Sequence, residues 1–299
     1  MTTVTSDILQ TAEHFIMRNA RLLDRLRFAY HFQRGHAEPV HAVLGAYRNV
    51  DGGYGNGLEP DLRGHGSQPL AVETALRILD ELGPIPRDLA QDTCTYLISV
   101  TRPNGGVGCV LPSVRHSEAA PWWRDQDDFG GALRPTAAIA GLLHKQHISH
   151  RWRDRATAFC WTRIGALHWT HPEEAIAVCT FLEHAPNRAR AKAEFARLAP
   201  MIRAVIELDP AAEGQVHTPL DIADRPDAIA RQLFTDAQIN AHLDHVIAQQ
   251  QPDGGWPAPG PTWCLGSTND RRAAITLKRL LTLRAYHRLG HPVTVQRTT

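Results

Sequence analysis

Two adjacent glycines preceded by Asp or Asn occur three times in this chain, and this recurrence constrains the fold more than any other feature. The copies are residues 51–53, 104–106 and 253–255, which begin 53 and 149 residues apart. Because 149 is close to three times fifty, the simplest interpretation is a unit of about fifty residues with two degenerate copies between positions 110 and 250. Six such units would fill the 299 residues.

Each recognisable copy has the same order of parts: an amphipathic segment, the glycine doublet, a Pro-rich loop and a second apolar helix. The second helices begin near Pro69 and Pro135, and the last one is expected to stop at Gly290. The helices expected from the pattern cover residues 40–48, 69–79, 89–100, 135–143, 150–166, 171–185, 188–207, 227–233, 239–250 and 271–289. No long run alternates apolar with polar residues, so the sequence predicts helical hairpins and no strands.

Composition and charge limit the cellular location and the kinds of partner that we expect for this protein. The net charge is +1 without a basic stripe, which argues against a nucleic-acid partner. The start of the chain does not resemble a secretory signal, and no window of 18 uncharged apolar residues occurs, although one broad helix face could still contact a membrane surface. The five cysteines are odd in number and lack a C-x-x-C pair, so we expect a reducing, cytoplasmic location.

The last repeat carries Gln250-x-x-x-Gly254-x-Trp256, which resembles the repeat motif of squalene and oxidosqualene cyclases and related toroids. Residues 44–54 and 97–108 resemble weaker copies. The resemblance implies the terpenoid cyclase and protein prenyltransferase superfamily: an all-α (α/α)6 toroid of about six hairpins, similar to a terpenoid cyclase β-domain, with residues 1–299 as one domain. Residues 51–63 and 120–123 also resemble bacterial single-domain proteins described as prenyltransferase-like or squalene-cyclase-like.

In class II cyclases of that superfamily an Asp-x-Asp-Asp motif protonates an alkene or epoxide, and Asp125-Gln126-Asp127-Asp128 has that form. The resemblance makes Asp127 and Asp128 the proton donor and its partner, with Asp125 beside them. Such an acid must be neutral when it acts, which requires burial or a neighbouring carboxylate. The motif stands about eight residues too early, because Arg134 occupies the place before the helix start where the acids belong. A solvated loop of charges is the alternative.

A second acidic candidate is the loop that contains Glu59, Asp61 and Arg63. Loops on one face of a ring converge on its mouth. Glu59 and Asp61 could act as an acid pair or hold a diphosphate through Mg²⁺, while Arg63 could contact an anionic substrate. A structural ion pair that closes the loop is equally consistent with these residues. Arg134 is a further candidate contact for an anion.

Five aromatic residues lie beside Gly-rich turns and could line a hydrophobic cavity or serve as packing anchors. They are Tyr54, Trp122, Trp123, Trp256 and Trp263. The seventeen histidines show no ligand spacing typical of zinc toroids.

The leading hypothesis from the sequence is an isoprenoid-cyclase-like enzyme, an isomerase or lyase, that starts carbocation chemistry on a hydrophobic substrate, with or without a diphosphate. It needs no redox cofactor. The alternatives are a non-catalytic toroid that binds a lipid, peptide or partner protein, and a zinc-dependent transferase or cyclase on the same fold.

Overall fold

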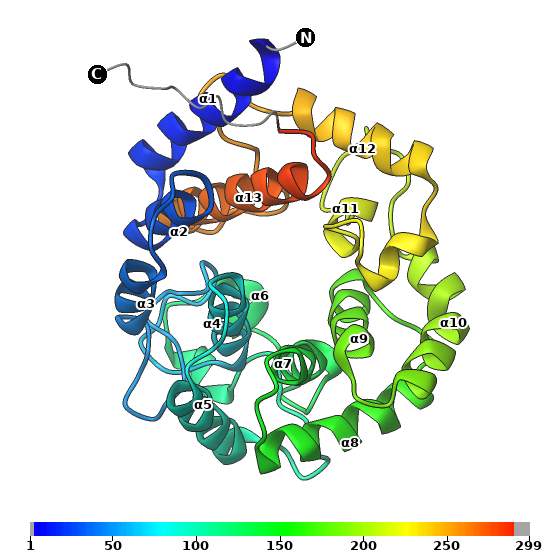
Figure 1. Ribbon diagram of the computed structural model, residues 1–299. Coiled ribbons are helices and arrows are strands. Elements are labelled where there is room, and N and C mark those ends of the chain that lie inside the picture. The colour runs from blue at the N-terminus through cyan, green and yellow to red at the C-terminus, as the bar shows by residue number, and fades with distance from the viewer. Residues whose placement is uncertain (1–2, 290–299) are drawn as a thin grey trace. The chain divides into compact units, whose positions relative to one another are not determined.

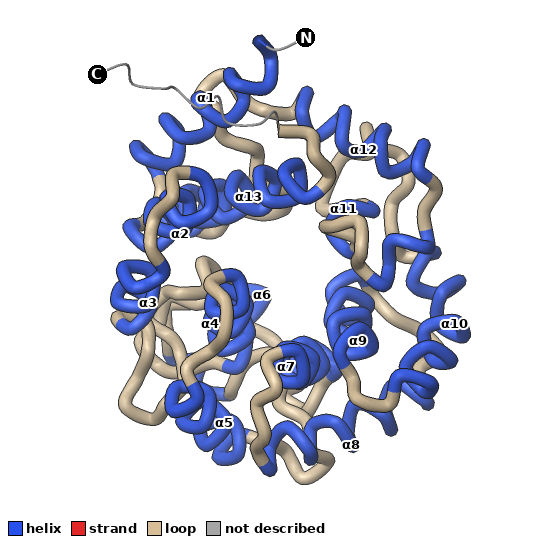
Figure 2. The backbone as a smooth tube through the Cα atoms, in the orientation of Figure 1, coloured by secondary structure: helices blue, strands red, loops and turns tan. Residues whose placement is uncertain are grey.

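The computed structural model describes residues 3–289, and within them thirteen α-helices and two 3-10 helices make up the regular structure. The extended pairing in these residues is limited to two isolated bridges, Arg48 with Tyr54 and Leu62 with Ala119. Figure 2 shows helices joined by loops, without a strand. The all-α class predicted from the sequence is therefore confirmed.

The helices, which Figure 1 labels in chain order, divide into two compact units. One unit takes its described residues from Met1–Gly35 and Leu208–Thr299, and the other is His36–Glu207. The first contains α1 (Thr3–Asn19), α2 (Leu22–Phe32), α11 (Pro219–Ile222), η2 (Ile229–Leu233), α12 (Asp236–Ala248) and α13 (Leu265–Ala285). The second contains α3 (Ala37–Gly45), α4 (Pro69–Glu81), α5 (Arg87–Val100), η1 (Pro112–His116), α6 (Pro121–Arg124), α7 (Leu133–Lys145), α8 (Arg151–Gly165), α9 (Pro172–His184) and α10 (Arg188–Ala204). The single toroid domain expected over 1–299 stays a prediction.

Most expected helices occur within three residues of their predicted ends, and two differ. Segment 227–233 forms the 3-10 helix η2 instead of an α-helix. The last helix begins at Leu265 because Cys264 caps it there, its sulfur accepting a hydrogen bond of 3.3 Å from the N–H of Ser267. It ends at Ala285, shortly before His287, whose φ of 56° is left-handed. The expected stop at Gly290 lies outside the described residues.

In the larger unit α7 packs against α4, α8 and α9. The α7–α9 contact is close at Gly141 of α7. A Cβ at Gly141 would lie 2.5 Å from the carbonyl oxygen of Thr180 in α9, so a larger residue would push the helices apart. The start of α9 is fixed by His171, whose side chain accepts a hydrogen bond from the N–H of Glu174.

The three glycine doublets form the same turn. In every copy the Asp or Asn side chain accepts a hydrogen bond of 2.9–3.1 Å from the N–H of the second glycine. The carbonyl of that glycine accepts a bond of 2.8–2.9 Å from the residue two positions before the motif. The first glycine has a φ between 86° and 96°, which favours glycine over other residues. The repeat inferred from the sequence is therefore a repeat of backbone geometry.

Each turn also packs against a helix of its own unit in the same way. The two glycines contact two residues that lie one helical turn apart, and the second of these is aromatic. The pairs are Asp92 and Tyr96 in α5, Arg155 and Phe159 in α8, and Thr11 and Phe15 in α1. The side chain of any other residue at the second glycine would overlap the aromatic ring. The doublet thus joins one hairpin to a neighbouring helix.

Gln250 and Trp256 hold the third turn as the motif predicts. The amide of Gln250 donates to the carbonyl oxygens of Ile8 and Gly254, both at 2.9 Å. Trp256 is buried, and its indole N–H donates to the carbonyl of Val246 at 2.7 Å. These bonds tie the end of α12 to α1 within the smaller unit.

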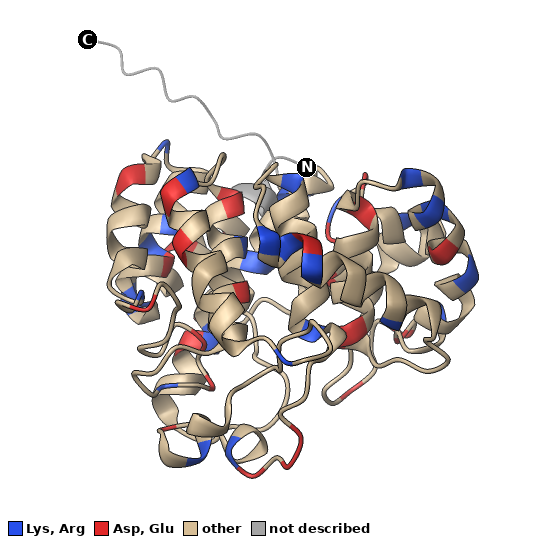
Figure 3. Cartoon of the chain, turned by 90° about the horizontal axis from the view of Figure 1, so that it is seen from below, with Lys and Arg blue, Asp and Glu red and all other residues tan. Residues whose placement is uncertain are grey.

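None of the helices in the described part of the chain is both long and apolar enough to cross a membrane. Acidic and basic residues are interspersed along the helices (Figure 3).

Candidate functional site

The loop before α4 and the first turns of α4, α7 and α9 bring several charged side chains together. Glu59 and Asp61 belong to the loop, Glu73 to α4, and Arg134 to the start of α7. The charges of Asp61, Glu73 and Arg134 all affect the pKa of the Glu59 carboxyl. An apolar cluster that includes Leu62 and Leu70 supports the loop, and the Trp123 ring packs against the same cluster.

Glu59 is the acid whose protonation is most altered in this cluster. The hydroxyl of Thr74 donates a hydrogen bond of 2.9 Å to its Oε2. Burial raises the pKa of Glu59 above its ordinary 4.5, and the charges of Asp61 and Glu73 act in the same direction. The Thr74 hydroxyl and the Arg134 guanidinium lower the pKa, but burial outweighs them. Glu59 is therefore held toward the neutral form that a proton donor requires.

Glu73 belongs to the same cluster, and only one of its two carboxylate oxygens has a partner. Its Oε1 lies 2.8 Å from the Nη2 of Arg77, one turn along the helix. Its Oε2 is buried and has no hydrogen-bond partner in the structure. A buried oxygen without a partner is costly, so this atom can still accept a hydrogen bond from a ligand or contact a positive charge.

Arg134 joins the cluster to α9 and α6. Its Nη1 lies 3.9 Å from Glu173 Oε1, and its guanidinium stands over the Trp123 ring, 5.9 Å from the centroid. Its carbonyl accepts the thiol hydrogen of Cys109 at 3.1 Å, and burial raises the pKa of that thiol to about 11. Glu173 in turn lies 3.1 Å from His171 Nδ1. One cation is thus placed between an aromatic ring and a carboxylate.

The Asp125–Asp128 segment, the other acidic candidate, is exposed to solvent. The Asp127 side chain is 102% exposed and lies 3.4 Å from Arg115, and Asp125 is 65% exposed beside Arg124. Asp128 is exposed as well and accepts a hydrogen bond from the N–H of Gly130. All three carboxylates are therefore in contact with water, as the solvated-loop alternative expects.

The aromatic candidates separate into different environments. Trp123 lies at the acidic cluster, while Trp122 next to it is 38% exposed. Trp256 is a packing anchor in its turn, and Trp263 is half-buried in the loop before α13; both belong to the smaller unit. Tyr54 is buried, and burial raises the pKa of its phenol to about 12.

Sequence reasoning missed Glu73, Thr74 and Glu173. A signal for the first two exists, because they are the polar residues in the first, otherwise apolar half of the helix that begins at Pro69. Glu173 follows Pro172 at a helix start, which sequence reasoning attributes to favourable charge at the helix N-terminus. Nothing in the sequence indicates that it reaches Arg134.

Among residues 3–289 no group of three or more His, Cys, Asp and Glu side chains is arranged to hold a metal ion. The described residues therefore give no support to the Mg²⁺ site or the zinc site considered from the sequence.

No protein-family model matches this chain, and no curated protein matches it.

Proposed function

We propose that the protein is an isoprenoid-cyclase-like enzyme in which Glu59, rather than the Asp125–Asp128 segment, donates the proton that starts the reaction. The observation that carries this proposal is the raised pKa of Glu59, caused by burial and by two neighbouring carboxylates. Among the acids named from the sequence, it is the one whose surroundings favour the neutral form.

The reaction is an acid-initiated isomerisation. The O–H bond of Glu59 breaks, its proton adds to an alkene carbon of the substrate, and the π electrons form the new C–H bond. The resulting carbocation is attacked by a second double bond, which closes a ring. Loss of a proton to the unpartnered Oε2 of Glu73 forms the product alkene. Glu73 then releases this proton to solvent, and solvent returns a proton to Glu59. No atoms are gained or lost in the cycle.

The neighbours of Glu59 suit a cationic intermediate and an anionic substrate group. The Trp123 ring face attracts positive charge, as its contact with the Arg134 guanidinium illustrates. Arg134 in turn provides a planar cation for a diphosphate, with Arg63 in the neighbouring loop as a second. The substrate we propose is therefore an unsaturated isoprenoid, either as the hydrocarbon or as its diphosphate.

We propose further that the hairpins of the whole chain follow an (α/α)6 toroid. The support is the shared turn geometry, which occurs twice in the larger unit and once in the smaller one. Equivalent turns that bind equivalent helix faces are expected of a repeated hairpin.

To test this proposal, the protein is incubated with squalene, farnesyl diphosphate and geranylgeranyl diphosphate, with and without Mg²⁺. The products are then analysed by gas chromatography and mass spectrometry. We expect a cyclised isomer from at least one of these, and its loss by about 100-fold or more in Glu59→Gln. Glu118→Gln, in the loop after η1, is the matched control. No cyclised product from any substrate, or full activity of Glu59→Gln, contradicts the proposal and favours a non-catalytic toroid.

A further inference from the structure

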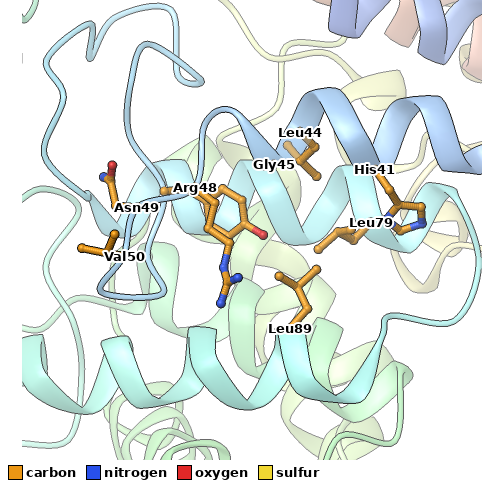
Figure 4. A pocket seen from close by; sticks show the side chains of 9 residues that line it. His41, Leu44, Gly45, Arg48, Asn49, Val50, Leu79 and Leu89 are labelled. Atoms are coloured by element: carbon orange, nitrogen blue, oxygen red, sulfur yellow. The ribbon is translucent and has the colours of Figure 1, made fainter.

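A pocket of about 360 Å³ lies between α3, the first glycine turn, α4 and α5 (Figure 4). Leu44, Leu79 and Leu89 provide apolar walls from the three helices, and Arg48 and Tyr54 come from the turn. Pockets of roughly this size, mostly apolar with a few polar groups, are typical small-molecule sites. None of the carboxylates of the Glu59 cluster lines it.

The Arg48 side chain, which lines the pocket, is incompletely bonded. Its Nε atom is buried and has no hydrogen-bond partner in the structure. A buried polar atom that is left without a partner destabilises the protein. A ligand oxygen that reaches this end of the pocket would recover part of that cost.

Arg48 has donors to spare. Its guanidinium carries five N–H groups, and the structure gives it one ion pair, from Nη2 to Asp92 Oδ2 at 2.7 Å. The Asp92 side chain is 61% exposed, so water screens much of its charge. The guanidinium therefore still attracts a second carboxylate, and its planar fork matches that group in geometry.

We propose that this pocket binds a small carboxylic acid with an apolar tail, such as a medium-chain fatty acid. Its carboxylate lies on the Arg48 guanidinium, and its tail lies between Leu44, Leu79 and Leu89. The inference does not depend on the proposed cyclase activity, because it uses different residues and a ligand without a double bond.

Two substitutions test the site from different directions. Arg48→Met removes the cation but also the pair with Asp92, so its folding must be checked by circular dichroism. Gly45→Phe places a ring at the pocket wall. A Cβ at Gly45 meets no atom within 4 Å and the residue is exposed, so this variant is expected to fold. Arg87→Met, an exposed arginine at the start of α5, is the matched control.

The measurement is isothermal titration of the full chain with octanoate at fixed ionic strength, with 1-octanol as the uncharged comparison. We expect one octanoate per chain, at least about tenfold weaker binding in Arg48→Met and Gly45→Phe, and unchanged binding in Arg87→Met. Absence of saturable octanoate binding to the unsubstituted protein overturns the proposal, as does unchanged binding in Gly45→Phe. Equal affinity for 1-octanol overturns the carboxylate assignment.

Discussion

The hydroxyl of Thr74 in α4 donates a hydrogen bond of 2.9 Å to Glu59 Oε2 in the preceding loop. This contact places the acid above the first turns of α4, and it opposes the rise in pKa that burial causes. The same bond therefore holds the side chain in position and adjusts the pH at which it ionises.

Thr74→Val is expected to move the alkaline limb of the activity profile to higher pH. The hydroxyl favours the charged carboxylate, so its removal raises the pKa of Glu59 further, and the protonated, active form persists as the pH increases. Activity at the acidic plateau should stay within about threefold, because Glu59 keeps its proton there. Cyclase assays from pH 5 to 9 check this, with the exposed Thr95→Val on α5 as control. A limb that stays in place or moves to lower pH contradicts the assignment.

The double variant Asp127→Asn, Asp128→Asn is expected to keep activity within about twofold. Both side chains are exposed, and an Asn at position 128 can still accept the hydrogen bond from Gly130. The measurement is the initial rate with the preferred substrate. A loss approaching the ~10²-fold or more typical of a missing general acid would return the proton-donor role to this segment.

Gly254→Ala is expected to destabilise the protein much more than Gly214→Ala. The two glycines have φ values of 89° and 96°, so both variants meet a similar conformational cost of about 1–2 kcal/mol. A Cβ at Gly254 would also lie 2.0 Å from the carbonyl oxygen of Thr11, whereas one at Gly214 meets no atom within 4 Å. Urea denaturation should give a loss of about 3 kcal/mol or more for Gly254→Ala. Equal losses would show that the turn does not pack against α1 as described.

His144→Gln is expected to remove part of the protein's acid sensitivity. Burial lowers the pKa of His144 from 6.5 to about 4, and the Arg153 charge acts in the same direction. The unfolded chain therefore binds this proton at higher pH than the folded chain does, so the stability from neutral His144 is lost as the pH falls from 6.5 toward 4.

Urea midpoints at pH 7 and pH 4.5 measure the effect. The difference between the two midpoints should be smaller in His144→Gln than in the unsubstituted protein, and unchanged in the exposed control His168→Gln. Equal differences in all three proteins would contradict the burial of a neutral His144.

Asp24→Ala is expected to reduce the free energy of unfolding by about 3–5 kcal/mol. Asp24 is fully buried, with Arg21 and Arg27 at 3.1 and 3.0 Å, and its removal leaves two partly buried cations without this carboxylate. The exposed pair of Asp244 with Arg288 in the same unit provides the control, since Asp244→Ala should cost about 1 kcal/mol or less. Similar losses for both variants would mean that the Asp24 cluster is more hydrated than its burial indicates.

The sequence alone determined the local structure of the repeat. Asp51, Asn104 and Asp253 precede glycine pairs because a side-chain oxygen must accept a bond from the second glycine and the first must adopt a positive φ, and both requirements act within a few residues. Local signals likewise predicted most of the helix ends. The start of α13 was predicted wrongly because Cys264, an unusual N-cap residue, caps the helix. Such features are short-range, so composition and spacing report them.

Tertiary structure decided which acid is buried. Asp127 and Glu59 are both carboxylates in loops, and the sequence favoured the former by motif. The fold left Asp127 in water and set Glu59 against Thr74 and Glu73, because the loop around Leu62 packs on the first turn of α4. Burial depends on residues far away in the chain, and the pKa of a carboxyl follows its burial more than its neighbours in sequence.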